Sequence, residues 1–351
     1  MSSSLKTLIH TLGSAGKAPW MYECPDGSRV LALPHGGRVL GLFTAGSDEN
    51  FYWTHPALES AASAAAFYAS EAWHNSGGDR TWLAPEVDVF LPAFPDTAGY
   101  FQPRQLDPGR YEAVETGGRF RLVNRLTVTL SRTGEAVELE MAKSLAPAPD
   151  PLRYERAVDL SGVTYAGYSQ HTSLELLSGS GPVGLWNLVQ MPLGGDLIVP
   201  TYTPSHPKII FGNIAPEDLS ASGRMIRFRM HAPGEHKIGI RAVATAGRVG
   251  YLHDCGGGIW SLIVRNFAVN PSGEYIDAPW DDTADLGYST QACSVNSGLG
   301  QFAELEYHIP AIGGATGRSR CEDTCQVWAY RGSRERVLAA AGALLAPVTD
   351  L

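Results

Sequence analysis

The segment Arg119-Phe-Arg-Leu-Val-Asn-Arg-Leu-Thr-Val-Thr-Leu130 alternates polar and apolar side chains along most of its length. After it come the turn-forming residues Arg132-Thr-Gly-Glu135 and a second run of β-type pattern, Ala136–Ala142. Alternation with a period of two places the apolar side chains on one face of an extended strand, whereas a helix would need a period of 3.6. The two runs and their turn therefore predict a β-hairpin with one buried face.

Short β-rich runs of this kind fill most of the chain, and 39 glycines and 23 prolines punctuate them. Besides the hairpin, strands are predicted at Ser28–Leu33, Gly37–Phe43, Tyr154–Leu160, Tyr165–Leu177, Gly184–Gln190, Met225–His231, Lys237–Ala244, Arg248–His253, Ile259–Phe267, Gln291–Ser297 and Phe302–Ile309. Helical pattern is confined to Ala57–Trp73 and Ser333–Leu345. Many strands with one or two short helices predict an all-β sandwich.

Composition limits the partners and the compartment. The 351 residues show no fixed-period repeat and no charged linker, so we expect a single domain over 1–351. The net charge is −9, with no Lys/Arg-rich run, which argues against nucleic acid or an anionic membrane surface as a partner. Residues 1–12 lack the apolar core of a signal peptide, and no apolar run approaches the ~20 residues of a membrane span. We therefore expect a cytoplasmic protein.

Cysteine usage agrees with a reducing compartment. There are five cysteines, an odd number and a low density for this length. Cys321 and Cys325 are four residues apart, but no second Cys/His pair completes a zinc set. We interpret them as ordinary thiols and expect no metal and no cofactor.

Three segments carry residue types suited to a sugar. His74-Asn-Ser-Gly-Gly-Asp-Arg-Thr-Trp-Leu-Ala-Pro-Glu86 holds Asp79 and Arg80 for hydroxyl groups and Trp82 as a flat apolar surface. The predicted strand Tyr165–Leu177 contains His171, which can donate a proton near neutral pH. In Leu185–Gln190, Trp186 and Gln190 share one face of an extended strand. Each segment also has a plain structural interpretation, as a loop with an ion pair or as a hydrogen-bonded core residue.

A further pattern is Gln301-Phe-Ala-Glu-Leu-Glu-Tyr-His-Ile-Pro310. Its alternation places Glu304, Glu306 and His308 on one face and the apolar side chains on the other. If the polar face lines a cavity, crowding would raise the pKa of one carboxyl and suit it to proton transfer, with metal binding as a weaker alternative. A solvated face is the plain interpretation. Elsewhere, Lys237 opens a predicted strand and could neutralise an anionic ligand group.

At these places the chain resembles the galactose mutarotase-like superfamily, which includes the aldose 1-epimerases. Gly36-Gly-Arg-Val-Leu-Gly-Leu42 resembles the opening strand of that family, and the Arg80 segment resembles its substrate-binding arginine loop. His171 resembles its catalytic histidine, and Glu304-Leu-Glu306 its glutamate strand. The resemblance spans residues 28 to 331 and implies a β-supersandwich. Trp82–Phe94 lacks the histidine of the true epimerases, which points to a separate branch.

The resemblance implies acid–base catalysis at a sugar anomeric centre. Glu306, or Glu304 in its place, would take the proton of the anomeric hydroxyl, while His171 protonates the ring oxygen. Arg80 and Asp79 would orient hydroxyl groups, and Trp82 or Trp186 would stack on the sugar. Two alternatives stay open: a lyase or glycosidase acting on an oligosaccharide, which can be an acidic or oxidised one, and a carbohydrate-binding protein without catalysis.

Overall fold

The computed structural model describes residues 3–116 and 119–345, and within them the strands form two antiparallel sheets. In spatial order the first sheet contains β1 (Trp20–Glu23), β2 (Arg29–Leu33), β3 (Arg38–Phe43), β4 (Asp79–Ala84), β9 (Gly184–Pro192), β18 (Gly300–His308), β17 (Tyr288–Ser297), β14 (Gly234–Arg241) and β11 (Lys208–Phe211). The second contains β12 (Leu219–Ser222), β13 (Met225–Arg229), β10 (Asp196–Pro200), β15 (Arg248–Gly256), β16 (Ile259–Asn266), β19 (Arg320–Ser333), β8 (Thr164–Ser178), β7 (Ala136–Pro147), β6 (Arg119–Thr129) and β5 (Glu112–Thr116).

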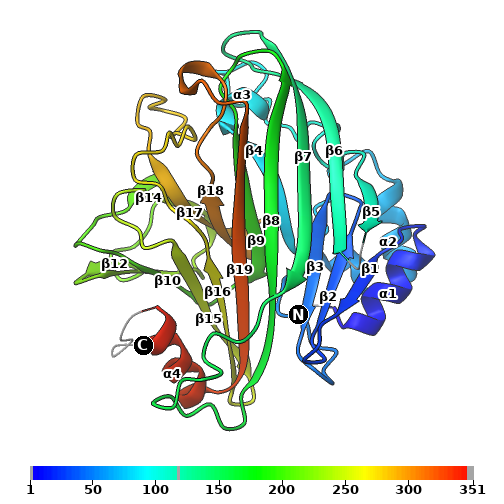
Figure 1. Cartoon of the computed structure of the whole chain (residues 1–351), viewed down its shortest axis with the longest axis vertical. Helices are drawn as coiled ribbons and strands as arrows, with labels where there is room; N and C mark the ends of the chain where they lie inside the picture. The colour runs from blue at the N-terminus through cyan, green and yellow to red at the C-terminus, as the bar shows by residue number, and fades with distance from the viewer. Residues whose placement is uncertain (1–2, 117–118, 346–351) are drawn as a thin grey trace.

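The two sheets form two layers, and in Figure 1 the long strands β8 and β19 stand in front of β9 and β18. The apolar inner faces of both layers contribute to one core cluster, which includes Val189 and Leu305 of the first sheet and Leu174 and Val327 of the second. Burying the apolar face of each sheet against the other is the main stabilising contribution in such an architecture. The all-β sandwich predicted from the sequence is confirmed, and so is the hairpin of β6 and β7.

Helices cover the outer surfaces of both sheets. On the N-terminal part of the first sheet, α1 (Leu5–Ser14) and α2 (Ala61–Ala69) pack on β2 and β3. The 3₁₀ turn η1 (Pro56–Glu59) precedes α2. At the other end of the chain, α4 (Arg334–Leu344) packs on β16 and β19. The helices expected near α2 and α4 are thus present but shorter, and α1 lies where no helix was predicted. No helix in the described ranges is long and apolar enough to span a bilayer.

The predicted strand Tyr154–Leu160 is wrong, because that stretch is a turn-rich loop after β7. Tyr154 is 83% exposed there and has no sheet to pack against. The segment around Arg80, in contrast, contains the regular strand β4 rather than only a loop. That strand decides which side chains face the core, so its presence changes the interpretation of the site.

Two connecting segments cover the outer face of the first sheet beyond the helices. Directly after β4, α3 (Glu86–Val89) begins a long connection to β5, and another connection runs between β16 and β17. The short 3₁₀ turn η2 (Gly314–Thr316) lies between β18 and β19. Because the two connections contribute Tyr100 and Trp280, polar side chains on that face of the sheet are removed from solvent.

Candidate functional site

The outer face of the first sheet carries a buried group of polar side chains on five adjacent strands. Arg80 of β4 is opposite Leu188 of β9, which in turn is opposite Glu306 of β18. Two residues further along each strand from the Leu188–Glu306 pair, Gln190 of β9 is opposite Glu304 of β18. Since residues in register on neighbouring strands share a face, these side chains project to the same side.

The register continues across the next two strands. Glu304 pairs with Cys293 of β17, and Cys293 pairs with Lys237 of β14. His308 pairs with Trp186 of β9. These side chains and the previous ones form a cluster that we call the outer cluster, made up of Arg80, Trp82, Trp186, Gln190, Lys237, Cys293, Glu304, Glu306 and His308.

Glycine at position 78 allows β4 to approach its neighbour at the start of this strand. Gly78 has a φ of 70°, and a Cβ atom there would lie 2.2 Å from the carbonyl oxygen of Val39 in β3. Only glycine combines that backbone conformation with so close an approach. The turn therefore fixes where Arg80, two residues later, projects from the sheet.

Two ion pairs hold the carboxylates of β18. Arg80 Nη2 lies 2.8 Å from Glu304 Oε1, to which Gln190 also donates a hydrogen bond at 3.0 Å. Lys237 Nζ lies 3.4 Å from Glu306 Oε2, and the indole N–H of Trp186 donates to the same oxygen at 2.9 Å. Both carboxylates are buried, Glu306 completely. Pairing is required, because an isolated buried charge would be strongly destabilising.

A further carboxyl, that of Glu86, completes the charge pattern above Lys237. Glu86 Oε2 is 3.7 Å from Lys237 Nζ and accepts a hydrogen bond from the indole of Trp280 at 3.0 Å. Tyr100 donates to Glu86 Oε1 at 2.9 Å. The rings of Tyr100 and Trp280 stack with centroids 5.8 Å apart. One lysine thus lies between two carboxyls, under an aromatic cover.

Aromatic rings line the outer cluster beside the charges. The Arg80 guanidinium lies 4.1 Å from the centroid of the Trp82 ring, and Lys237 Nζ lies 4.4 Å from that of Trp186. His308 stacks on the same Trp186 indole, with the ring centroids 5.7 Å apart. Cation–π contact stabilises each charge in a place that water does not reach.

Burial shifts the acid–base properties of three groups. It raises the pKa of Glu306 to about 8; Lys237 opposes that shift and Glu304 adds to it. Burial also raises the pKa of Glu86, again against the effect of Lys237. For His308, burial and then the charge of Lys237 lower the pKa well below its usual range, so the imidazole is neutral. A carboxyl that titrates near neutrality is suited to proton transfer.

The outer cluster leaves much of its hydrogen-bonding capacity unused. Several of its buried atoms have no hydrogen-bond partner: Nε and Nη1 of Arg80, Oε1 of Gln190, Oε1 of Glu306 and both ring nitrogens of His308. Asp277 lies 3.8 Å from His308 Nε2, beyond hydrogen-bond distance. Buried polar atoms normally form hydrogen bonds, so an atom without a partner indicates that a ligand or a water binds there. Here donors and acceptors converge from three neighbouring strands, which is the pattern of a polar ligand site.

Metal binding has one candidate group within the described ranges, formed by Cys293, Glu304 and Glu306. One ligand atom from each lies within 4.8 Å of the others. His308, considered from the sequence as a ligand, is not a member of that group. Arg80 and Lys237 already neutralise the two carboxylates, and burial raises the pKa of the Cys293 thiol well above its usual range. The donor set therefore favours protonated or ion-paired side chains over a metal ion.

Asp79, predicted to orient hydroxyl groups together with Arg80, lies on the other face of β4. It precedes Arg80 in an extended strand, so its side chain points to the opposite face, into the sandwich core. There it is fully buried between Lys143 at 3.2 Å and Arg265 at 2.8 Å. Asp79 therefore holds the two sheets together and does not contact a ligand on the outer face.

His171, predicted to be the catalytic acid, lies apart from the outer cluster. His171 lies on β8 of the second sheet, where it pairs with Thr324 of β19, and its side chain is 44% exposed. Its ring contacts Thr324 Oγ1 at 3.2 Å and lies 3.9 Å from Glu322. The outer cluster is in the other sheet, so His171 and Glu306 do not meet. The other predicted residues do come together in the outer cluster: Arg80, Trp82, Trp186, Gln190, Lys237, Glu304, Glu306 and His308.

Sequence reasoning counted Glu86 among the hydrogen-bonding groups of the Arg80 segment without giving it a role, and it missed Cys293 and the cover formed by Tyr100 and Trp280. Glu86 ends the segment quoted around Arg80, and Cys293 lies in a predicted strand. Two residues before it in β17 is Gln291, another buried polar residue of the same face. The alternation that places Gln291 and Cys293 on one face of β17 was the signal available for Cys293. Nothing local marked Tyr100 or Trp280.

The hollow nearest to the outer cluster is lined by Trp73, Tyr100 and Asp107 among others, with a volume of about 290 Å³. Asp107 Oδ2 accepts the indole N–H groups of both Trp73 and Trp82 at 3.0 Å. The Arg80 guanidinium lies 5.4 Å from the Trp73 ring centroid. One wall of the hollow is therefore in contact with the arginine end of the cluster.

Comparison with known proteins found similar solved structures but no match by sequence. No family model and no curated protein matches its sequence. Among solved structures, it is similar to a galactose mutarotase related enzyme from Lactobacillus acidophilus, with a TM-score of 0.46 and 11% identity over 90% of this chain and 97% of that one. A galactose 1-epimerase from the same organism matches with a TM-score of 0.46 and 7% identity, over 91% of this chain and 95% of that one.

An aldose epimerase homologue from C. elegans is similar as well, with a TM-score of 0.42 and 8% identity, over 90% of this chain and 99% of that one. These similarities carry no information about which side chains of this chain act.

Proposed function

We propose that the outer cluster binds a sugar and moves protons at its anomeric centre, with Glu306 as the base. The observation that carries this proposal is the combination of a buried carboxyl whose pKa is raised to about 8 with unpartnered donors and acceptors around it. A sugar ring offers several hydroxyl groups that donate and accept hydrogen bonds, and an apolar face that stacks on indole.

The proton transfers can be written with groups of the outer cluster. Ionised Glu306 takes the proton of the anomeric hydroxyl, the electrons of that O–H bond form the carbonyl, and the bond from the anomeric carbon to the ring oxygen breaks. Lys237, next to Glu306, gives a proton to the ring oxygen. After rotation about the adjacent carbon–carbon bond, the reverse transfers close the ring as the other anomer and restore both side chains.

The other residues position the sugar in this proposal. Arg80 uses its free Nε and Nη1 atoms for hydroxyl groups, and Gln190 accepts with its free amide oxygen. Neutral His308 contributes a hydrogen bond without a competing charge. Lys237 takes the role of the acid that the sequence suggested for His171, because it lies beside the base. The sugar approaches past Trp73 and Tyr100, and the Tyr100–Trp280 cover has to move aside.

Anomer interconversion measured by NMR tests the proposal. Freshly dissolved α-anomers of a panel of aldoses and uronates are followed with and without the protein, and exchange at equilibrium is measured by saturation transfer. We expect acceleration for at least one sugar, lost in Glu306→Gln and kept in His171→Ala. A panel on which the protein accelerates nothing rejects the proposal.

Binding without catalysis is the second candidate, and one observation favours it. Both carboxylates of β18 are already paired with cations, Glu304 with Arg80 and Glu306 with Lys237. Such pairing suits a rigid recognition surface as well as a catalytic one. Calorimetry on the same panel separates the two: a binding protein retains sugar affinity in Glu306→Gln and accelerates no exchange.

A further inference from the structure

We propose that the sugar bound by the outer cluster is an amino sugar, and that its ammonium group is held by Asp277, Gln291 and His308. This inference rests on the proposed function, because it names the substrate class of the site described there. Two independent observations carry it. Buried carboxyls outnumber buried cations in this part of the protein, and acceptor atoms without a hydrogen-bond partner lie beside them.

The charges of the outer cluster do not balance. Four carboxyls are buried in it and around it, against the two cations Arg80 and Lys237; they belong to Glu86, Asp277, Glu304 and Glu306. The two cations pair with the carboxylates of β18, and Glu86 only shares Lys237, at 3.7 Å. Among the described residues, the only ion-pair contact of Asp277 is His308, whose imidazole is neutral. Negative groups are therefore in excess.

Neighbouring charges do not remove this excess. Asp107, at the border of the outer cluster, is paired with buried Arg38 at 2.8 Å, so this pair adds no net charge. Lys208 of β11 and Arg241 of β14 lie towards the edge of the sheet and both contact Asp285. They are 40% and 42% exposed, and solvent screens exposed charges far more than buried ones.

Two of the carboxyls respond to their surroundings by a shift in pKa. Burial raises the pKa of Glu86, and it raises that of Glu306 to about 8; Lys237 opposes both shifts and the neighbouring carboxyls add to them. Protonation is one way to remove uncompensated buried charge, and binding of a cationic ligand is another. We therefore expect an ammonium group to bind in exchange for protons.

The acceptor atoms without a partner lie on β17 and β18, next to these carboxyls. Gln291 of β17 is opposite Glu306 of β18, and Oε1 of each has no hydrogen-bond partner. The Gln291 amide nitrogen donates to Asp277 Oδ2 at 3.0 Å, which fixes the orientation of the amide. Neutral His308, two residues beyond Glu306, has two ring nitrogens without a hydrogen bond, and one of them is an acceptor.

An ammonium group matches these acceptors better than a hydroxyl group does. It has three N–H donors, no acceptor and a positive charge, whereas a hydroxyl group donates one hydrogen bond and carries no charge. Asp277 supplies the opposite charge, and Gln291 and His308 supply two further acceptors. At the other end of the cluster, Arg80 has two donor atoms without a partner, which suit the oxygens of hydroxyl groups.

The place of these acceptors relative to Glu306 selects the position of the amino group. C2 of an aldose is bonded to the anomeric carbon, so a sugar with its anomeric hydroxyl at Glu306 has its C2 substituent beside that carboxyl. Side chains directly opposite each other on neighbouring strands are about 5 Å apart at Cβ, which brings Gln291 within reach of the same substituent. The expected class is therefore the 2-amino-2-deoxyaldoses.

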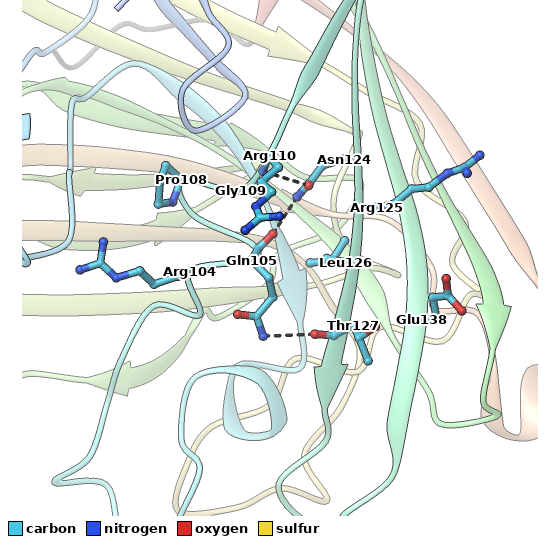
Figure 2. Close-up of a pocket in the computed structure, with 10 residues that line it drawn as sticks. All are labelled: Arg104, Gln105, Pro108, Gly109, Arg110, Asn124, Arg125, Leu126, Thr127 and Glu138. Carbon is cyan, nitrogen blue, oxygen red and sulfur yellow. Dashed lines mark hydrogen bonds between the residues drawn. The ribbon is translucent and has the colours of Figure 1, made fainter. Parts of the chain in front are cut away.

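The groove along β6, shown in Figure 2, differs from the outer cluster in its charges. Arg125 pairs there with Glu140 at 2.8 Å, and Arg104 pairs with Glu71 at 3.2 Å. Both arginines are more than half exposed, and in Figure 2 their side chains extend to opposite sides. Because these charges are paired and reach solvent, they indicate no charged ligand.

Titration calorimetry on matched sugars tests the inference. Glucosamine, galactosamine and mannosamine are each compared with the parent hexose and with the N-acetyl derivative, at about pH 6.5, where the amine is protonated. We expect at least one amino sugar to bind about tenfold more tightly, or better, than both of its counterparts. Titrations in buffers of different ionisation enthalpy should show that protons are released when it binds.

Asp277→Asn removes the negative charge beside the ammonium group and keeps the size of the side chain. It should reduce the affinity for the amino sugar by about tenfold or more and leave that for the parent hexose largely unchanged. Asp218→Asn is the matched control, because Asp218 is similarly buried and is paired with His231 at 2.8 Å, beside β12 of the second sheet. It should change neither affinity. Thermal unfolding checks that both variants are folded.

The inference is overturned if no amino sugar binds more tightly than its parent hexose, if the binding releases no protons, or if folded Asp277→Asn keeps the preference. The comparison of sugars on the wild type decides even where the variant does not fold. Accelerated anomer exchange of neutral hexoses without preference for an amino sugar rejects the ammonium site alone. Preferential binding of an amino sugar without accelerated exchange of any sugar rejects the catalysis and leaves the ammonium site.

Discussion

Asp79 and Arg80 are consecutive in the sequence, and they belong to two buried charge clusters on opposite faces of β4. Asp79 lies in the core with both carboxylate oxygens engaged, Oδ1 by Lys143 and Oδ2 by Arg265. Arg80 lies in the outer cluster, where its Nε and Nη1 atoms have no partner. We interpret the first cluster as a structural connection between the sheets and the second as a ligand site.

The difference teaches how buried charge can be interpreted. Burial and ion pairing are common to both clusters, so neither feature identifies a site. Arg265 of the core cluster also has an unpartnered Nε, but in the outer cluster such atoms come from several side chains, both donors and acceptors, beside a carboxyl whose pKa burial has raised to about 8. Such a combination is unfavourable for stability unless something binds there.

The largest effect that this comparison leads us to expect is on catalysis by the outer cluster. Glu306→Gln keeps the size of the side chain but removes the base, so anomer exchange should fall by about 10²- to 10⁴-fold. Saturation-transfer NMR on the best sugar of the panel gives the rate, and circular dichroism checks the fold. A folded variant with undiminished exchange would show that Glu306 is not the base.

The core cluster should respond in stability rather than in activity. Asp79→Ala leaves Lys143 and Arg265 facing each other without their anion, which should reduce the free energy of unfolding by about 3–5 kcal/mol. Lys143→Met is the milder control, because Asp79 and Arg265 remain paired. Urea unfolding measures both. Equal stability of Asp79→Ala and the wild type would contradict the structural role of Asp79.

The pH dependence of stability should separate the two faces further. The raised pKa of Glu306 means that the folded protein keeps a proton which the unfolded chain releases near pH 4.5. Its contribution to stability is therefore fully present below that pH and is lost as the pH rises to about 8, with a slope of up to about 1.4 kcal/mol per pH unit. Glu306→Gln should flatten this slope in unfolding experiments between pH 5 and 8. An unchanged slope would mean that other groups cause it.

The smallest effect should come from His171→Ala. Half-exposed His171 contacts only Thr324 and Glu322 at the surface of the second sheet, so the free energy of unfolding should change by no more than about 0.5 kcal/mol. Anomer exchange should remain within about twofold of the wild type. A large loss of exchange in this variant would restore His171 to the mechanism and break the comparison.

Local patterns in the sequence carried much of the fold and part of the site. The alternation of β18 predicted correctly that Glu304, Glu306 and His308 share a face, because a strand has a fixed period. It did not show that this face is buried, since the cover comes from Tyr100 and Trp280, far away in the sequence. Burial by distant connections has no local signal.

The errors have equally specific causes. Asp79 was grouped with Arg80 because their segment was interpreted as a loop; as a strand, it sends the two side chains to opposite faces. His171 was placed in the site by resemblance of a short motif, while strand pairing across 153 residues puts it beside Thr324 in the other sheet. The order of strands within a sheet depends on long-range pairing, which single-sequence patterns do not contain.

The measurement that tests the difference between the two clusters most directly is a ¹³C NMR titration of the glutamate side-chain carboxyls. We expect one carboxyl with an apparent pKa near 8 that is missing from the spectrum of Glu306→Gln and present in that of His171→Ala. Addition of a bound sugar should shift this resonance. If every glutamate titrates near its ordinary value of 4.5, or if the high-pKa signal survives in Glu306→Gln, Glu306 is not the tuned base and the outer cluster is not the catalytic site described above.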